Sequence, residues 1–235
     1  MEWEVRRFGE IASTNSYLLG EAGSGAPEGV VAVADVQRAG RGRLGRTWEA
    51  PAGSSLLVSL LLRPRLPVER LHLAAAAVAL AATEACFEVA GLRPGLKWPN
   101  DLVMGGGHAK VGGILAETDL PAVVVGLGLN LDWPADALPA GAAALGRVDR
   151  EELLAALLAE LETRYGDWAG VSAEYRAACV TVGRSVRVEM GHETLTGTAV
   201  DLSDDGHLIV SPTGHHALRT VAAGDVVHVR PQGPD

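Results

Sequence analysis

The chain has 235 residues, 48% of them hydrophobic, and a formal net charge of −9. That apolar content supports a sizeable core and excludes an intrinsically disordered chain. The acidic balance disfavours binding to nucleic-acid phosphates, so we expect no nucleic-acid partner. The charged N-terminal segment MEWEVRRFGE has no apolar stretch of a secretion signal, and the apolar run Leu73–Ala82 is too short to cross a bilayer. We therefore expect a soluble, cytoplasmic protein without a membrane partner.

Cysteine and histidine form no recognisable metal-binding pattern in this sequence. Cys86 and Cys179 are the only cysteines and lie far apart, so they supply neither a disulfide framework nor a zinc finger. Most histidines fall in the C-terminal part of the chain, without the HExxH or HxH spacing of a metal site. We expect two partly buried thiols in a reducing compartment and no metal held by the protein.

Strands and helices are predicted in an irregular order along the first part of the chain. Strands are expected at Trp3–Phe8, Val30–Val36, Ser55–Leu62, Leu96–Trp98, Leu102–Met104, Val111–Glu117 and Val123–Leu131. A first helix follows the capping residues Ser13-Thr14-Asn15 and gives way to a small-residue loop at 20–29. Further helices are expected over 71–90, from the capping residue Asp149, and from Ser172.

After Val182 the sequence changes to short alternating segments. They span Ser185–Glu189, Gly197–Leu202, His207–Val210 and Val226–Val229, and turn residues separate them. This pattern predicts a small antiparallel β-barrel of about fifty residues. We therefore predict two domains, 1–182 and 183–235. The first should have an α+β fold, in which helices pack on a mixed β-sheet.

Residues 37–48, QRAGRGRLGRTW, are the most unusual segment of this acidic chain. Four arginines alternate with three glycines. Glycine lets the backbone approach a ligand closely, and arginine offers a planar fork to phosphate or carboxylate. A solvated basic turn or an RNA-binding RGG-like element would have a similar composition. We favour an anion-binding loop because the segment directly follows a buried strand and occurs once.

A second polar segment is KWPND at residues 97–101, which GGGHAKVGGI follows at 105–114. Lys110 is not a P-loop lysine, because Ala109 and Val111 stand where a Walker A motif needs Gly and Ser or Thr. At the start of a strand its ammonium group can point into a cleft, and a surface lysine on a hairpin is the alternative. GLGLN at 126–130 lacks the third glycine of a dinucleotide-binding fingerprint.

Taken in chain order, these segments resemble the motifs of the biotin–protein ligase family. Residues 37–48 look like its biotin-binding loop, 97–101 like its KWPND motif, and 110–115 like the K-x-x-G-I-L that follows. Ser13-Thr14-Asn15 and 126–130 resemble its first and last site motifs. The resemblance covers residues 13–130, and the family's SH3-like appendage corresponds to the predicted barrel. Twelve residues precede Ser13, so we expect the form without the N-terminal DNA-binding domain.

The resemblance implies that ATP activates biotin to biotinyl-5′-AMP, with Mg²⁺ on the phosphates, and that biotin passes to a lysine of a carboxylase's biotin carrier domain. Lys110, Arg41 and Arg43 are the implied catalytic residues. The implied biotin site comprises Ser13, Thr14, Asn15, Gln37, Gly40, Arg41, Gly42, Arg43, Lys110 and Gly113. The implied ATP site comprises Arg46, Trp48, Lys97, Asn100, Asp101 and Asn130. Short polar side chains suit the ureido ring, and cations offset the repulsion between carboxylate and phosphate.

Three other functions stay open at this point. A lipoate or octanoate ligase would share the chemistry, although its arginine-rich motif ending in H-x-D is missing. A non-catalytic biotin sensor would bind biotin without forming the adenylate, and an RNA-binding protein would use residues 37–48. The sequence does not distinguish a monomer from a homodimer. The glycines and like charges of residues 37–48 predict a loop that is mobile in the empty enzyme and ordered by its ligand.

Overall fold

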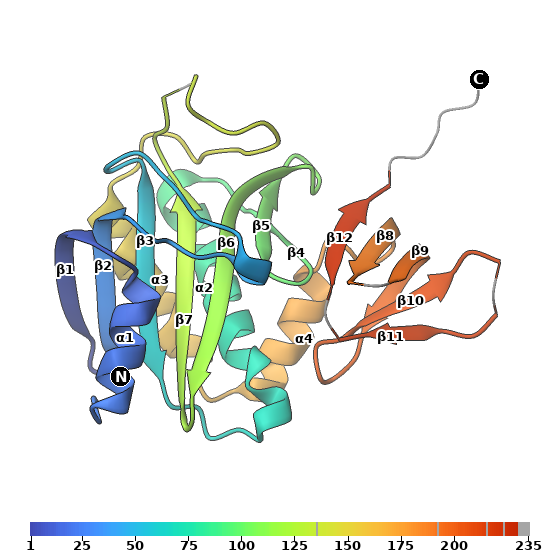
Figure 1. Ribbon diagram of the computed structural model, residues 1–235, viewed down its shortest axis with the longest axis horizontal. Helices are drawn as coiled ribbons and strands as arrows, with labels where there is room; N and C mark the ends of the chain where they lie inside the picture. The colour runs from blue at the N-terminus through green and yellow to red at the C-terminus, as the bar shows by residue number, and fades with distance from the viewer. Residues whose placement is uncertain (135, 192, 215, 223, 230–235) are drawn as a thin grey trace.

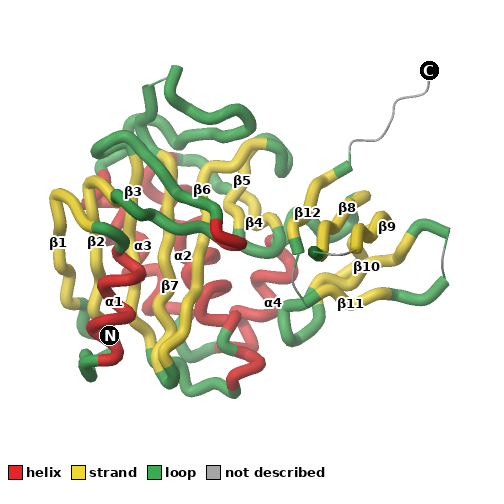
Figure 2. Tube along the Cα trace, in the orientation of Figure 1, coloured by secondary structure: helices red, strands yellow, loops and turns green. Residues whose placement is uncertain are grey.

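The computed structural model of the chain describes residues 1–134, 136–191, 193–214, 216–222 and 224–229. In these residues two β-sheets lie side by side (Figure 1). The long helices gather around the larger, N-terminal sheet, and the smaller sheet consists of strands and loops (Figure 2). The predicted α+β class is confirmed.

The larger sheet has seven strands in the order β1-β2-β3-β7-β6-β5-β4. They are β1 (Glu4–Ile11), β2 (Val30–Gln37), β3 (Ser55–Leu62), β4 (Gly95–Lys97), β5 (Asp101–Met104), β6 (Ala109–Asp119) and β7 (Ala122–Asn130). β1 and β2 pair in parallel, and the other neighbouring strands are antiparallel. The sheet is therefore mixed, as predicted, and its central strand β3 is buried along its whole length.

Four α-helices cover the two faces of this sheet. They are α1 (Thr14–Gly23), α2 (His72–Ala90), α3 (Arg150–Arg164) and α4 (Trp168–Ala178). α1 lies on one face, while α2 and α3 lie on the other, with α4 nearer the smaller sheet (Figure 1). Leu18 of α1 packs against Leu61 on its side of the sheet, and Leu60 faces the larger core on the opposite side. This three-layer arrangement leaves the N-terminus of α1 close to β3, β6 and β7.

Three predictions of local structure were wrong. α1 continues to Gly23, because Leu18 and Ala22 are buried against the sheet. α4 begins at Trp168 instead of Ser172, since the Asp167 side chain caps it by accepting from the Gly170 N–H. A short strand pairs with the C-terminal sheet at Arg219–Val221, where no strand was predicted.

The helical segment Val68–Ala90 is long and apolar enough to span a membrane by length and composition, with a mean hydropathy of 1.7. In the fold, however, 67% of its most apolar window is buried. α2 packs against both the sheet and α3, so this segment is the core helix of the domain. An alanine-rich helix allows such close approach to neighbours on several sides.

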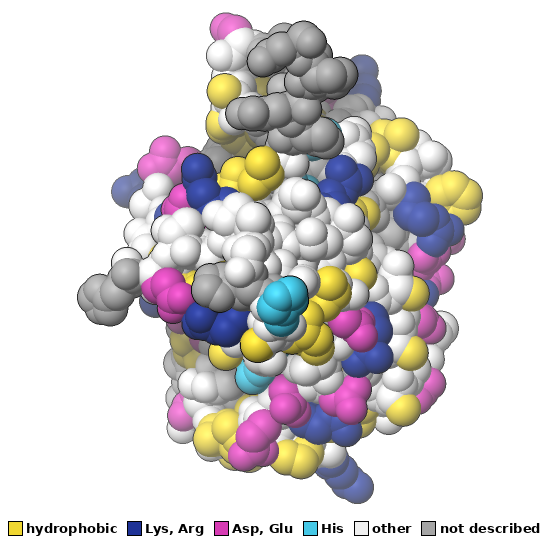
Figure 3. Space-filling view, turned by 90° about the vertical axis from the view of Figure 1, so that its right-hand side faces the viewer, with side chains coloured by type: hydrophobic (Ala, Val, Ile, Leu, Met, Phe, Trp, Pro, Cys, Tyr) yellow, Lys and Arg dark blue, Asp and Glu magenta, His cyan; other side chains and the backbone are white. Residues whose placement is uncertain are grey.

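The smaller sheet has the order β11-β10-β9-β8-β12, and its described neighbours are antiparallel. Its strands are β8 (Ser185–Met190), β9 (Glu193–Leu202), β10 (Leu208–Pro212), β11 (Arg219–Val221) and β12 (Asp225–His228). Closure into an SH3-like barrel and the domain boundary near Val182 stay predictions. Figure 3 views the molecule from this end, where acidic and basic side chains are intermixed, so this face carries no single-sign field.

Trp98 joins the two sheets. Although it belongs to the KWPND segment, its side chain is buried in the core of the smaller sheet. Its backbone N–H donates to Thr181 Oγ1 at 3.1 Å, and its indole N–H donates to the Gly206 carbonyl at 2.9 Å. The smaller sheet is therefore fixed beside residues 97–101.

Candidate active site

A cavity of about 280 Å³ opens between the N-terminus of α1, strands β3, β6 and β7, and the loop at residues 37–48. It gathers residues from sequence segments more than a hundred positions apart. Fourteen of the predicted site residues line it: Ser13, Thr14, Asn15, Gln37, Arg41, Gly42, Arg43, Arg46, Trp48, Lys97, Asn100, Asp101, Lys110 and Gly113. The fold thus places these residues around one space, and their individual roles stay predictions.

Gly40 and Asn130 are the two predicted residues that do not line the cavity. A Cβ on Gly40 would lie 2.3 Å from the Trp48 carbonyl oxygen, so only glycine lets the two ends of the loop meet. Asn130, at the end of β7, is 4% exposed. Its amide donates to the Ala143 carbonyl at 3.0 Å, so here it holds the segment that follows β7.

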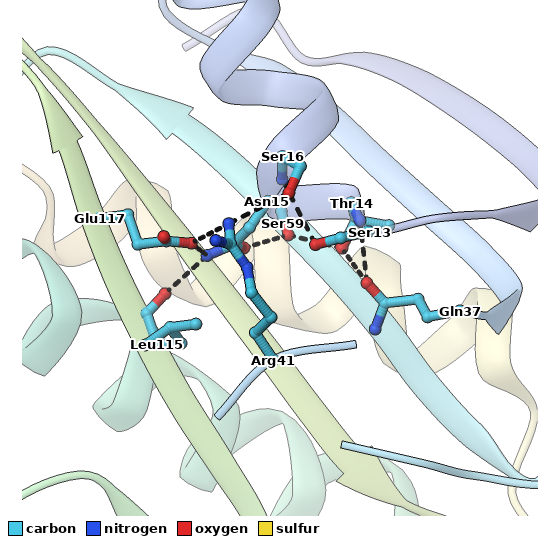
Figure 4. A network of polar contacts seen from close by, with 9 residues as sticks. All are labelled: Ser13, Thr14, Asn15, Ser16, Gln37, Arg41, Ser59, Leu115 and Glu117. Atoms are coloured by element: carbon cyan, nitrogen blue, oxygen red, sulfur yellow. Dashed lines mark hydrogen bonds and ion pairs between the residues drawn. The ribbon is translucent and has the colours of Figure 1, made fainter. Parts of the chain in front are cut away.

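A chain of hydrogen bonds builds the end of the cavity beside α1 (Figure 4). The Thr14 backbone N–H donates to Gln37 Oε1 at 2.8 Å. The Thr14 and Ser59 hydroxyl oxygens lie 2.7 Å apart, and the Ser59 hydroxyl donates to Asn15 Oδ1 at 2.6 Å. Thr14, Asn15 and Ser59 are all buried. These buried groups are uncharged and hold one another in fixed directions.

The same chain ends on Glu117 (Figure 4). Asn15 Nδ2 donates to the Leu115 carbonyl at 3.1 Å and to Glu117 Oε2 at 2.9 Å. Arg41 also donates to Glu117 Oε2, at 3.0 Å, and to Ser16 Oγ at 3.0 Å. Glu117 therefore connects a buried amide to a guanidinium group of the loop.

Lys110, Asp101 and Trp48 form the opposite end. Lys110 Nζ lies 2.6 Å from Asp101 Oδ1 and 5.5 Å from the centre of the Trp48 ring. The Trp48 ring lies against bare backbone, because a Cβ on Gly128 would be 2.5 Å from its Cε2 atom. Among the described residues its indole N–H has no acceptor. One proton of the ammonium group faces Asp101, which leaves two donors for an anion in the cavity.

The loop at residues 37–48 folds back on itself and contacts both sheets. Arg41 pairs with Thr47 in an antiparallel bridge, and the Gly42 N–H donates to the Arg46 carbonyl at 2.7 Å. Arg43 donates to Asn100 Oδ1 at 3.2 Å, and Arg46 forms an ion pair with Asp225 of β12. Two of its arginines thus contact different walls of the cavity.

Sequence reasoning missed several residues of the cavity. Ser59 and Glu117 complete the hydrogen-bond chain, and Glu189 and Asp225 line the cavity from the smaller sheet. Ser59 left a signal, because it is a polar residue in the middle of an apolar buried strand. Glu189 and Asp225 left none, since the docking of the second sheet is not readable from local patterns.

The cysteines and the described carboxylates and histidines offer no competing reactive centre. Burial raises the pKa of the Cys86 thiol to about 12 and also raises that of Cys179, so both stay protonated and unreactive. Among the described residues no group of three or more His, Cys, Asp or Glu side chains could hold a metal ion.

Comparison with known proteins gives a consistent result. A model of the "Biotin/lipoate A/B protein ligase family" matches residues 8–130, and one of the "Biotin protein ligase C terminal domain" matches residues 181–229. The chain is 39% identical to the biotin–[acetyl-CoA-carboxylase] ligase of Mycobacterium tuberculosis, over 94% of this chain and 87% of that protein. It is 28% identical to the bifunctional ligase/repressor BirA of Bacillus subtilis, over 92% and 71%. The structure of the biotin protein ligase of Aquifex aeolicus with biotin and ATP is similar, with a TM-score of 0.78, 25% identity, and coverage of 97% and 99%.

Proposed function

This chain belongs to the biotin/lipoate A/B protein ligase family, and we propose that it is a biotin–protein ligase that couples biotin to ATP and then to a carrier lysine. One observation carries the proposal: a single cavity has a neutral hydrogen-bonding end and a cationic end. Biotin has the complementary form, with a ureido ring at one end and a carboxylate at the other.

The ureido ring belongs at the end beside α1. Gln37 Oε1 accepts from the Thr14 N–H, so Gln37 Nε2 is free to donate to the ring carbonyl. Ser13 caps α1 through its oxygen, which leaves its hydroxyl proton for the same purpose. A ring carbonyl without such donors would be strongly disfavoured in a buried pocket.

The carboxylate and the ATP phosphates belong at the cationic end. In the first step a carboxylate oxygen attacks the α-phosphorus, the bond to the bridging oxygen breaks, and pyrophosphate leaves. Two anions must meet for this to happen. Lys110 and Arg43 would offset their repulsion and stabilise the charge that develops in the transition state. Arg41, which here donates to Glu117 and Ser16 beside α1, would join them by turning from these partners toward the phosphates. The half-buried Trp48 offers a flat surface for adenine, as the resemblance implies.

In the second step the carrier lysine attacks the acyl carbon of biotinyl-5′-AMP. An amide bond forms, AMP leaves, and the amine loses a proton. Because the adenylate is a mixed anhydride, water competes with the lysine. A loop such as residues 37–48, which reaches both walls of the cavity, is suited to exclude water until the carrier docks.

Mg²⁺ is expected to arrive on the nucleotide phosphates. Among the described residues no group of three or more His, Cys, Asp or Glu side chains could hold the ion. We also propose a cytoplasmic location. The support is chemical: both cysteines are free and buried, as is typical of a reducing compartment.

The decisive experiment combines the purified chain with biotin, ATP labelled on the α-phosphate and a biotin carrier domain. We expect labelled biotinyl-5′-AMP without the carrier, and biotin on one carrier lysine with release of AMP when the carrier is added. Parallel reactions with lipoate and octanoate test the related ligases. Adenylation of lipoate in preference to biotin, or tight biotin binding without adenylate, would overturn the proposal.

A further inference from the structure

The direction of each hydrogen bond beside α1 follows from two groups that can only accept. Asn15 has one amide atom near both the Leu115 carbonyl oxygen and the Glu117 carboxylate. That atom must be the nitrogen, because an oxygen there would face two acceptors. The carboxylate also accepts from Arg41, which confirms its role as an acceptor. The Asn15 carbonyl oxygen is therefore turned toward Ser59.

The orientation of the Asn15 amide fixes the direction of both hydrogen bonds of Ser59. Facing a carbonyl oxygen at 2.6 Å, its hydroxyl must donate to Asn15. A hydroxyl has one proton, so Ser59 can only accept from Thr14, whose oxygen lies 2.7 Å away. Ser59 is 0% exposed, which prevents water from offering either group another partner.

The direction of these hydrogen bonds determines what the Thr14 hydroxyl offers to a ligand in the cavity. The Thr14 hydroxyl oxygen lies near two acceptors, Gln37 Oε1 at 3.1 Å and the Ser59 oxygen at 2.7 Å. The shorter contact needs a proton that Ser59 has already given to Asn15, so the Thr14 proton points at Ser59 and the Thr14 oxygen presents only lone pairs to a ligand. The neighbouring Gln37 shows the opposite character, because its oxygen is occupied by the Thr14 N–H and its Nε2 donors remain. An acceptor and a donor thus stand side by side, and a cyclic urea carries an N–H next to a C=O.

We propose that Ser59, oriented by Asn15 and Glu117, is a specificity-determining positioning residue that makes Thr14 an obligate acceptor for a ureido N–H. The proposal rests on the function proposed above. The packing supports it, because a Cβ on Gly126, the cross-strand partner of Ser59, would lie 2.2 Å from Asn15 Oδ1. The backbone of β7 therefore leaves the room that the Asn15 amide needs.

The test compares biotin with its two cyclic carbamate analogues, in which a ring oxygen replaces one or the other ureido N–H. Calorimetric titration without ATP measures each dissociation constant. In the wild type, the analogue whose oxygen faces Thr14 should bind at least about a hundredfold more weakly than biotin, because two acceptors meet. In Ser59→Ala the freed hydroxyl can turn either to Gln37 Oε1 or to the oxygen of the analogue, so the ratio should shrink about three- to tenfold.

Ser55→Ala is the matched control. Ser55 lies on the same strand and is also buried, and its hydroxyl oxygen accepts from the Trp133 indole N–H outside the cavity. This variant loses a comparable hydrogen bond but should keep the wild-type ratio. Ser59→Thr retains the hydroxyl and should restore most of the discrimination. The KM for ATP should change little in any of the three variants.

A second pair of variants covers the case in which Ser59→Ala fails to fold. The Glu117 side chain is 24% exposed, so a substitution there should disturb the packing less than one at the fully buried Ser59. Glu117→Gln keeps an acceptor oxygen and should preserve the ratio. Glu117→Leu leaves only the Leu115 carbonyl to orient Asn15 and should shrink the ratio in part. An unchanged ratio in Ser59→Ala and Glu117→Leu, or an equal change in Ser55→Ala, would overturn the inference. A wild type that binds no biotin would instead overturn the proposed function.

Discussion

The two ends of the cavity are built in opposite ways. We call the end beside α1, where the ureido ring is proposed to bind, the ring end, and the end with Lys110 and Trp48 the charged end. The polar side chains of the ring end come from the start of α1 and from β3 and are almost completely buried. Ser13, Thr14, Asn15 and Ser59 are at most 5% exposed. At the charged end, the arginines come from the loop at residues 37–48 and Lys110 from the start of β6, and these groups are more accessible. The side chain of Arg46 is 65% exposed and that of Lys110 is 38% exposed.

The difference matches two tasks. Recognition of a neutral ring needs donors and acceptors in fixed directions, because a misdirected buried group loses its hydrogen bond entirely. Adenylation needs positive charge that follows the reacting anions, and the long, accessible side chains of arginine and lysine supply it. The same comparison predicts that substitutions at the charged end impair catalysis, while those at the ring end impair folding and selectivity.

The largest effect is expected at Lys110. Lys110→Ala removes a cation from the place where the carboxylate meets the α-phosphate, and adenylate formation should fall more than about a hundredfold. Biotin-dependent release of pyrophosphate measures the rate. Since Lys110 acts on charge and not on the ring, the melting temperature should change little.

The control for Lys110→Ala is Arg7→Ala, which removes an exposed cation that pairs with Glu151 far from the cavity. Exposed ion pairs contribute little, so this variant should keep both activity and stability. Pyrophosphate release close to the wild-type rate in Lys110→Ala would contradict the role of its ammonium group.

Substitutions at two glycines of β7 test the two ends of the cavity independently, because Gly126 lies against Asn15 and Gly128 lies against Trp48. In Gly126→Ala the new methyl group would lie 2.2 Å from Asn15 Oδ1, inside a rigid network, so we expect a loss of about 1–3 kcal/mol of stability. In Gly128→Ala it would lie 2.5 Å from the Trp48 ring, which can swing away. This variant should melt near the wild-type temperature yet show a KM for ATP raised about tenfold, as for the loss of one stacking surface.

Thermal melting and steady-state kinetics on both glycine variants decide between the two outcomes. Equal destabilisation by both substitutions would mean that Trp48 is held as firmly as Asn15. In that case the charged end would be as rigid as the ring end, and the contrast between them would fail.

A smaller effect is expected from Arg43→Gly. Arg43 holds the loop to the turn at residues 97–101 through one hydrogen bond to Asn100. Its loss, about 1 kcal/mol, should raise escape of the adenylate roughly fivefold while some activation persists. The escaped adenylate would acylate lysines of bystander proteins.

The composition of the chain dictates how this leak is measured. Only two lysines occur in the sequence, Lys97 and Lys110, so self-labelling is a poor reporter. A lysine-rich bystander protein should therefore be added, and its biotin counted at equal turnover for both enzymes. If Arg43→Gly labels the bystander no more than the wild type does, Arg43 serves binding and not retention.

Much of the fold was predictable because the local signals agreed. β3 was predicted at Ser55–Leu62 from its apolar run, and the structure has it at those residues. The cap at Asp149 located α3 correctly, since its carboxylate accepts from the first-turn N–H groups. The cap at Asp167 was overlooked, and with it the start of α4.

The site was predictable only where a motif marks it. The five motif segments, at residues 13–15, 37–48, 97–101, 110–115 and 126–130, supply most of the cavity lining. Glu117 and Asp225 stayed hidden because a single carboxylate on a strand looks like any solvated charge. Their importance arises from tertiary contacts, with Asn15 and Arg41 in one case and with Arg46 in the other. No local pattern specifies which distant strand will face the loop.

The smallest effect is expected at Asp225, which pairs with Arg46 across the two sheets. Asp225→Asn removes a negative charge from a cavity that must take up the ATP polyanion, and it frees an arginine that can bind phosphate. Exposed ion pairs contribute at most about 1 kcal/mol, so stability should hardly change. The KM for ATP should fall only about two- to threefold at low ionic strength, since the Arg46 side chain is 65% exposed and solvent screens its charge.

Salt is the variable that tests this interpretation. At high ionic strength mobile ions screen the Asp225 carboxylate, so the difference between Asp225→Asn and the wild type should disappear. Glu193→Gln is the matched control, because Glu193 lies on the same small sheet and pairs with Arg219 away from the cavity. It should leave the KM for ATP unchanged at every salt concentration. A rise in KM in Asp225→Asn that persists in high salt would mean that Asp225 holds the loop closed through Arg46. The charged end of the cavity would then depend on a fixed contact, as the ring end does.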